Sequence, residues 1–173
     1  MRDESTLNQL MLTYTSLLFR IAYYYTKNLH TAEDVVQDVF IKFFQMDIQL
    51  PEGEIQPYLM RMTANRAKDY LKSWHYRKLV LQEKLVFNKT IHEKDTLVQQ
   101  DEEAEISQAI LALPLKQREA IAYYYLEGLN SKEIALLLQI PESTVKSRIS
   151  KGRDRLKEQL KSIEWEVLLH ESI

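Results

Sequence analysis

Six polar and basic side chains lie near the start of one predicted helix, within residues 142–157. Val145 and Ile149 lie four residues apart, and we expect them to be buried on one face of that helix. The opposite face carries short hydroxyls and long cations, which match the hydrogen-bonding groups of base edges and phosphates. These outward residues are Ser143, Thr144, Lys146, Ser147, Ser150 and Lys151. The pattern predicts a helix that docks in the major groove of duplex DNA.

A preceding helix and a short turn are expected to hold this recognition helix. We expect the first helix to begin at Ser131, with Ser131 as its cap. Gln139 falls at a turn position that needs a left-handed backbone and often holds glycine, and Ile140 should fill the angle between the helices. Together these features predict a helix-turn-helix; the alternative is an ordinary helical hairpin with a charged surface. The expected inner face of the first helix is Ile134, Ala135 and Leu138.

Two basic segments stand in an acidic background, although the net charge is −2. Residues 61–78 hold six Lys/Arg against one Asp, and residues 131–161 hold eight against four acids. Residues 1–60 hold four against eight, and residues 79–104 hold three against six. A single charged run is usually a solvated helix face, but two separate basic helices indicate two contacts with a polyanion.

The composition excludes several classes of function. Cysteine is absent, so disulfides, thiolate nucleophiles and Cys-ligated zinc are impossible. The four histidines are far apart in the chain, and no catalytic set, phosphate-binding loop or metal pattern is present. We therefore predict a non-enzymatic protein without a cofactor or metal. No apolar run approaches the length of a membrane span, and the charged N-terminus has no signal-like stretch, which predicts a cytoplasmic protein.

The helical periodicity predicts an all-α chain of two small domains. Three glycines and four prolines leave long uninterrupted stretches. We expect helices over about 5–28, 31–45 and 58–78, with Thr31 as an N-cap and a loop at 46–57, where Pro51, Gly53 and Pro57 occur. A flexible linker is expected over 79–103, a second helical domain over 104–161 and a tail over 162–173.

Three motifs together resemble one family. The stretches LPLKQREA, LNSKEIA and IPESTVKSRISKGR, between Leu113 and Arg153, resemble region 4 of bacterial sigma factors, which binds the −35 promoter element. Residues 32–40 (AEDVVQDVF) resemble the core-binding helix of region 2. Residues 58–71 (YLMRMTANRAKDYL) resemble its −10 element helix. The order, the linker and the absence of other sigma regions resemble the small extracytoplasmic-function sigma factors, over about residues 8–78 and 104–161.

The resemblance implies a protein that binds core RNA polymerase and promoter DNA, both duplex and single-stranded, and so directs promoter opening and transcription initiation. It assigns one face of the 31–45 helix to the basic clamp helices of the polymerase's largest subunit: Asp34, Gln37, Asp38 and Ile41. It assigns the outward face of the 58–78 helix to the −10 element: Tyr58, Arg61, Asn65, Lys68, Asp69 and Lys72. Asn65 falls at the pocket for a flipped base, with loop 46–57 as its wall.

The chain departs from the family at Tyr58 and Met60, where the family usually has Trp and another aromatic residue. We expect the aromatic surface for separated strands to be thinner for that reason, and Trp74 to pack in the core. The alternative function is a helix-turn-helix regulator with an N-terminal dimerisation or sensing domain. The resemblance also implies that a membrane-anchored anti-sigma factor is a common kind of partner.

Overall fold

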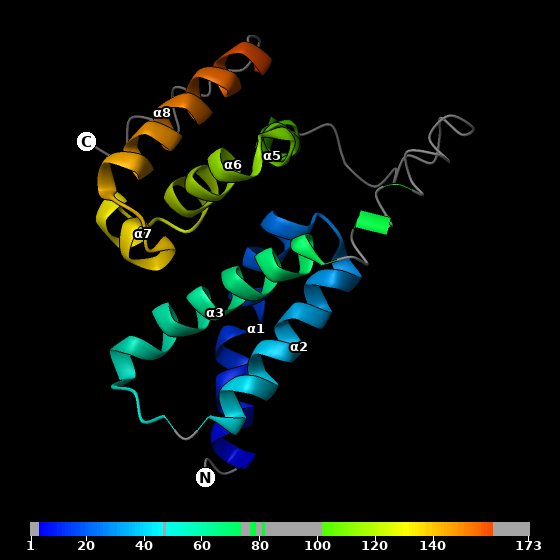
Figure 1. Cartoon of the computed structure of the whole chain (residues 1–173), viewed down its shortest axis with the longest axis vertical. Helices are drawn as coiled ribbons and strands as arrows, with labels where there is room; N and C mark the ends of the chain where they lie inside the picture. Colours follow the sequence, from blue (N-terminus) through cyan, green and yellow to red (C-terminus); the bar gives the residue numbers. More distant parts are fainter. Residues whose placement is uncertain (1–3, 47, 74–76, 79–80, 82–101, 161–173) are drawn as a thin grey trace. The chain divides into compact units, whose positions relative to one another are not determined.

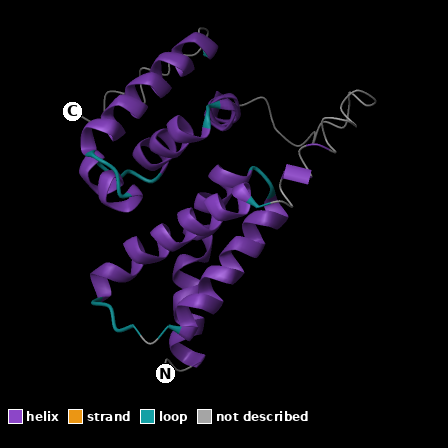
Figure 2. Ribbon diagram, in the orientation of Figure 1, coloured by secondary structure: helices purple, strands orange, loops and turns teal. Residues whose placement is uncertain are grey.

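The structure, a computed structural model, describes residues 4–46, 48–73, 77, 78, 81 and 102–160. In these residues it contains helices and connecting turns and no strand (Figure 2). Contacts divide the chain into two compact units, residues 1–93 and 94–173. The prediction of an all-α fold with two small helical domains is confirmed. No described helix is long and apolar enough to cross a membrane. Most of the expected linker and tail lies outside the described residues.

The first unit is a bundle of three helices, α1 (Glu4–Thr26), α2 (Leu29–Gln45) and α3 (Glu52–Lys72), each packed against the other two (Figure 1). Each helix contributes an apolar stripe to the shared core because its apolar residues recur at helical spacing. The stripes meet in a core that includes Leu18, Ile21, Val39, Phe43, Leu59 and Ala67.

The junction between α1 and α2 differs from the prediction. Asn28, and not Thr31, is the N-cap of α2: the Asn28 side chain accepts a hydrogen bond of 2.9 Å from the Thr31 backbone N–H. Thr31 is buried, and its hydroxyl donates to the Tyr70 hydroxyl at 3.4 Å. Sequence spacing favoured Thr31 because Asp34 follows it, but the helix begins one turn earlier, at Leu29.

Helix α3 begins earlier and ends earlier than predicted. Residues 52–57, predicted as loop, are helical, with Pro51 at the N-cap and Pro57 inside the helix. Pro57 is the sixth helical residue, past the first turn, so its missing N–H removes the bond that a residue there would donate to the Gly53 carbonyl. The helix ends at Lys72 instead of residue 78. Met60 is buried and is therefore no part of a DNA-facing surface, and Trp74 lies outside the described residues.

The second unit contains α5 (Glu102–Ala112), α6 (Leu115–Ile121), the π-helical turn η1 (Ala122–Leu126), α7 (Ser131–Leu138) and α8 (Glu142–Gln159). Helix α8 packs mainly along α6 and crosses α7 near its own start (Figure 1). The core of the unit includes Leu113, Ile121, Tyr123, Ile134 and Val145, all nearly or fully buried.

Helices α7 and α8 form the predicted helix-turn-helix. Gln139 has φ 55° and ψ 46°, which confirms the left-handed backbone predicted there. The cap prediction is wrong by one residue: Asn130 is the N-cap and forms a reciprocal capping box with Glu133. The inner face is also shifted, because Ile134 and Leu137 are buried while Ala135 and Leu138 are half-buried.

Two contacts fix α8 against α6. A Cβ atom added to Gly152 would lie 2.6 Å from Ile121 Cγ1, so only glycine allows this approach of the helices. One turn earlier, Arg148 Nη1 donates to Glu119 Oε1 at 2.8 Å, and the Glu119 side chain is 4% exposed. Breaking such a buried pair leaves an uncompensated charge and costs about 3–5 kcal/mol. The pair and the glycine together set the position of the recognition helix.

We predict that Gly152→Ala destabilises the second unit. Alanine is the better helix former by about 1 kcal/mol, but the added methyl meets Ile121, which is fully buried and has little room to move. Overpacking of this kind costs about 1–3 kcal/mol, so a net loss is expected. Urea unfolding followed by circular dichroism measures it. Gly53→Ala is the matched control, because nothing lies within 4 Å of its Cβ position; equal stability of the two variants would contradict the prediction.

Candidate nucleic-acid interface

The outward face of α8 matches the prediction closely. Val145 and Ile149 are 0% and 5% exposed, so both point into the unit. Five of the six predicted contact residues are exposed and Thr144 is half-buried. The exposed five are Ser143, Lys146, Ser147, Ser150 and Lys151. Hydroxyls and ammonium groups therefore occupy the first two and a half turns of the helix, where a recognition helix meets base edges.

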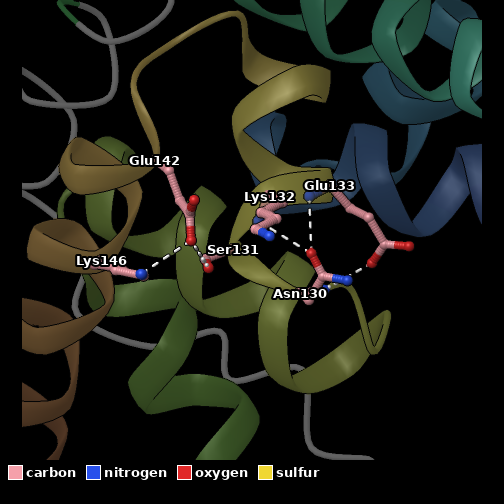
Figure 3. A network of polar contacts seen from close by, with 6 residues as sticks. All are labelled: Asn130, Ser131, Lys132, Glu133, Glu142 and Lys146. Atoms are coloured by element: carbon pink, nitrogen blue, oxygen red, sulfur yellow. Dashed lines mark hydrogen bonds and ion pairs between the residues drawn. The ribbon is translucent and has the colours of Figure 1, made fainter.

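A small polar network ties the start of α8 to the start of α7 (Figure 3). Glu142 Oε1 accepts a hydrogen bond from the Ser131 hydroxyl at 2.7 Å and forms an ion pair with Lys146 Nζ at 2.9 Å. The Lys146 ammonium, and after it the Ser131 hydroxyl, hold the pKa of Glu142 below its ordinary value. Glu142 thus remains a carboxylate at neutral pH.

Two other cations of α8, Arg148 and Arg153, make contacts within the unit. The sequence presented Arg148 and Arg153 as parts of one basic run, yet Arg148 pairs with buried Glu119. The Arg153 guanidinium lies 5.7 Å from the Tyr124 ring centroid and donates to the Tyr125 hydroxyl. Burial raises the pKa of Tyr125, although Arg153 opposes the shift. The exposed cations of α8 are Lys146, Lys151, Arg155 and Lys157.

Helix α3 presents a second polar surface on the first unit. Asn65, Asp69 and Lys72 are exposed, while Arg61 and Lys68 are half-buried. Because Asn65 is exposed, its side-chain amide makes no buried hydrogen bond within the fold. The two half-buried cations lie over aromatic rings, which fixes their stems: Arg61 is 5.7 Å from the Tyr58 ring centroid, and Lys68 is 5.4 Å from that of Tyr25.

Tyr58 lies at the edge of the bundle. Its ring centroid is 5.9 Å from that of buried Phe43, and its hydroxyl is 3.5 Å from Met46 Sδ. The ring is half-buried, so one part packs on the core while another part, which the Arg61 guanidinium approaches, remains exposed. The segment beside it is shorter than predicted, because only residues 46–51 lie between α2 and α3.

On α2, three of the four residues predicted to bind a protein partner are exposed: Asp34, Gln37 and Ile41. Ile41 is 56% exposed, which is high for an isoleucine beside a well-packed core. Asp38 is different, because its carboxylate forms an ion pair with Arg66 of α3, with Arg66 Nε donating to Oδ2 at 2.8 Å. The two residues are 28 apart in sequence, and no local signal could have indicated this pair.

Comparison with known proteins gives consistent matches for both units. Residues 10–76 match the family model for sigma-70 region 2, and residues 103–156 match that for sigma-70 region 4. The chain is 27% identical over 153 residues to the ECF RNA polymerase sigma factor SigM of Bacillus subtilis, covering 88% of this chain and 93% of that protein. It is 31% identical over 132 residues to the RNA polymerase sigma factor SigZ of the same organism, covering 74% and 72%.

Two solved structures share the fold. The sigma factor RpoE of Bartonella quintana, solved with the anti-sigma factor NepR, matches with a TM-score of 0.60 at 21% identity, covering 90% of this chain and 96% of that one. CnrH, solved with the cytosolic domain of CnrY, matches with a TM-score of 0.63 at 20% identity, covering 92% and 90%. At these identities the likeness shows a common fold.

Proposed function

The chain belongs to the sigma-70 family, in its extracytoplasmic-function group, and from this premise we propose which of its surfaces meet promoter DNA and which meet RNA polymerase. Its function is that of an alternative sigma factor, which binds core RNA polymerase and promoter DNA and is not an enzyme. The alternative of a regulator with a dimerising or sensing domain is not retained, because residues 10–76 match region 2.

The −35 element is assigned to the exposed face of α8. The observation that carries the assignment is the burial of Val145 and Ile149, which leaves Lys146, Lys151 and four hydroxyl side chains on the side away from the unit. Lysines at this position suit guanine edges and phosphates, and serines suit either. The cations of this helix that serve the fold, Arg148 and Arg153, are not part of the proposed contact set.

The −10 element is assigned to the α3 surface with Tyr58. Exposed Asn65 offers an amide that can both donate to and accept from the edge of an unstacked base. Arg61, Lys68 and Lys72 supply positive charge along the same helix for the strand backbone. Stacking on an aromatic ring stabilises separated bases, and the half-open ring of Tyr58 is the surface we propose for it.

Core polymerase is assigned to the exposed face of α2. Asp34, Gln37 and Ile41 combine an acid, an amide and an exposed apolar side chain on one helix face, which suits a partner with basic and apolar groups. Asp38 belongs to the same face but already pairs with Arg66. We therefore propose that Asp38 shapes the face through α3 as well as contacting the partner.

The partner set of this chain is proposed to include an anti-sigma factor, membrane-anchored in the usual manner of the group. The support for this proposal is that one structure that shares the fold is a complex with an anti-sigma factor. We place the chain in the cytoplasm, since a sigma factor must reach polymerase on the chromosome.

The direct test of the function is transcription in vitro. The full chain added to purified core RNA polymerase is expected to direct a discrete transcript from the DNA upstream of its own gene, and core polymerase alone is not.

We also predict that Asp34→Arg weakens core binding about tenfold, because like charge then meets the basic clamp helices. Glu33→Arg is the matched control on the neighbouring exposed position. Equal core affinity of the two variants, measured by competition, would contradict the assigned face. Asp38 is unsuited to this test because its replacement by Arg would also oppose Arg66.

A second prediction concerns the −35 contact. Replacing Lys146 and Lys151 with Ala should weaken binding of the holoenzyme to promoter duplex by about 1–3 kcal/mol if either lysine reads a base. If both meet only phosphates, the salt dependence should flatten by about two units instead. Lys42→Ala with Lys116→Ala removes the same charge from exposed positions on other helices and is the control. A gel shift across several salt concentrations measures both quantities, and binding identical to that of the control would exclude the proposed contacts.

The third prediction concerns Asn65. Because its side chain is exposed, Asn65→Ala should leave the melting temperature and core affinity nearly unchanged while reducing promoter opening. The reduction should depend on the base at one −10 position, since a base-reading amide loses discrimination when it is removed. Permanganate footprinting on a set of −10 variants measures opening. Asn8→Ala removes another exposed amide, on α1 and outside every surface assigned to DNA or polymerase, and should have no such effect. An equal loss on every −10 sequence would show that Asn65 reads no base.

A further inference from the structure

We propose that Glu142 is a specificity-determining positioning residue, which holds the Lys146 ammonium toward a guanine edge in the −35 element and away from the phosphates. The inference rests on the proposed −35 function of α8 and names a role for a residue outside the predicted contact set. Its basis is the network in Figure 3, where one carboxylate oxygen joins Ser131 at 2.7 Å and Lys146 at 2.9 Å.

A carboxylate at this place calls for an explanation. Glu142 is the first residue of α8, at the end that enters the groove in a helix-turn-helix. Negative charge there opposes the DNA phosphates and lowers the general affinity for DNA. Interaction with the helix dipole favours an acid in the first turn, but the dipole requires contact neither with the preceding helix nor with Lys146. The contacts with Ser131 and Lys146 both fall on Oε1, so the carboxylate is anchored from two sides.

The anchor changes what Lys146 can do. A lysine ammonium is a compact charge on a flexible four-carbon stem, and when unrestrained it meets any phosphate within reach. The ion pair with Glu142 uses one of its three N–H donors and fixes the end of the stem. Lys146 is still 65% exposed, so its ammonium has two further donors and remains accessible to a ligand. Guanine presents two acceptors, O6 and N7, side by side in the major groove, which two fixed donors can bind together.

The same restraint gives the salt dependence of binding a definite direction. A lysine that meets a phosphate releases a counterion, and each such contact adds about 0.9 to the slope of log affinity against log salt concentration. While Glu142 holds Lys146, this lysine makes no phosphate contact and adds nothing to the salt slope. Loss of Glu142 should therefore make binding tighter for DNA in general, steeper in its salt dependence and poorer in its discrimination at one base position.

The experiment compares base preference position by position. The full chain, with core RNA polymerase, is incubated with a pool of linear duplexes randomised over 16 base pairs, and bound DNA is sequenced. Four proteins are compared: the unchanged chain, Glu142→Ala, Lys146→Ala and the double variant. We expect a guanine preference at one position to fall by about fivefold or more in both single variants, toward the lower limit of a bidentate contact. The double variant should resemble Lys146→Ala.

Salt titrations of the same four proteins give the second readout. Glu142→Ala should steepen the salt slope by about one unit when Lys146 is present and leave it unchanged when Lys146 is absent. Glu158→Ala removes the same charge sixteen residues later on α8, about 24 Å away, and should alter neither readout. Ser131→Ala keeps the Glu142 charge but removes its anchor, and it should reduce the same guanine preference. If Glu142→Ala folds poorly, the guanine preference of Ser131→Ala is measured in its place.

Three outcomes would overturn the inference. Glu142→Ala could keep the base preference of the unchanged chain. It could lose the preference at a position that Lys146→Ala leaves intact. It could also change the base preference or the salt slope further when Lys146 has already been replaced. The last two would make Glu142 a contact residue in its own right. A holoenzyme of the unchanged chain without any upstream base preference would instead contradict the proposed −35 function, and the inference with it.

Discussion

The position of the recognition helix depends on one close helix–helix contact. Gly152 of α8 lies against Ile121 of α6 at a distance that excludes any Cβ atom, and the buried Glu119–Arg148 pair lies one turn earlier on the same interface. The glycine determines how near the helices come, and the ion pair opposes sliding along the axis, since a displaced Arg148 would lose its contact with the buried Glu119 carboxylate. This contact fixes the orientation of α8 and therefore the direction of every side chain on its outer face. The position of the proposed DNA-binding surface is thus determined by the buried packing of α8 on α6.

The first unit relies on a comparable tie between its two functional helices. The Asp38–Arg66 pair joins α2, which we assign to polymerase, to α3, which we assign to the −10 element. Both side chains are partly exposed, so the pair contributes little to stability by itself. Its consequence is a direct link between the two proposed surfaces, because it joins a residue of α2 to a residue of α3. A partner that binds Asp38 would therefore also affect Arg66 of α3.

The cations of this protein fall into two groups that their sequence does not separate. Arg148, Arg153 and Arg66 bind acids or aromatic rings of the fold, whereas Lys146, Lys151 and Lys72 are exposed. The division mostly follows the chemistry of the side chains, with exposed Arg155 and Lys68, which lies over the Tyr25 ring, as exceptions. Guanidinium groups are weakly hydrated and planar, which suits buried pairs and ring stacking, while ammonium groups are strongly hydrated and remain outside. Lys146 is intermediate, since it is exposed but held by Glu142.

The sequence alone determined the helical fold, the division into two units and the direction of α8, because apolar periodicity reports which side of a helix is buried. It also indicated the left-handed residue Gln139, since a short turn between two helices leaves few backbone choices. The helix ends were predicted poorly: Asn28 and Asn130 are the caps where Thr31 and Ser131 were expected, and α3 includes Pro57. Neighbouring residues compete for a cap on small energy differences, and packing decides among them. Only the tertiary structure could pair Asp38 with Arg66, Glu119 with Arg148 and Ser131 with Glu142, because these contacts join residues on different helices and depend on how the helices pack.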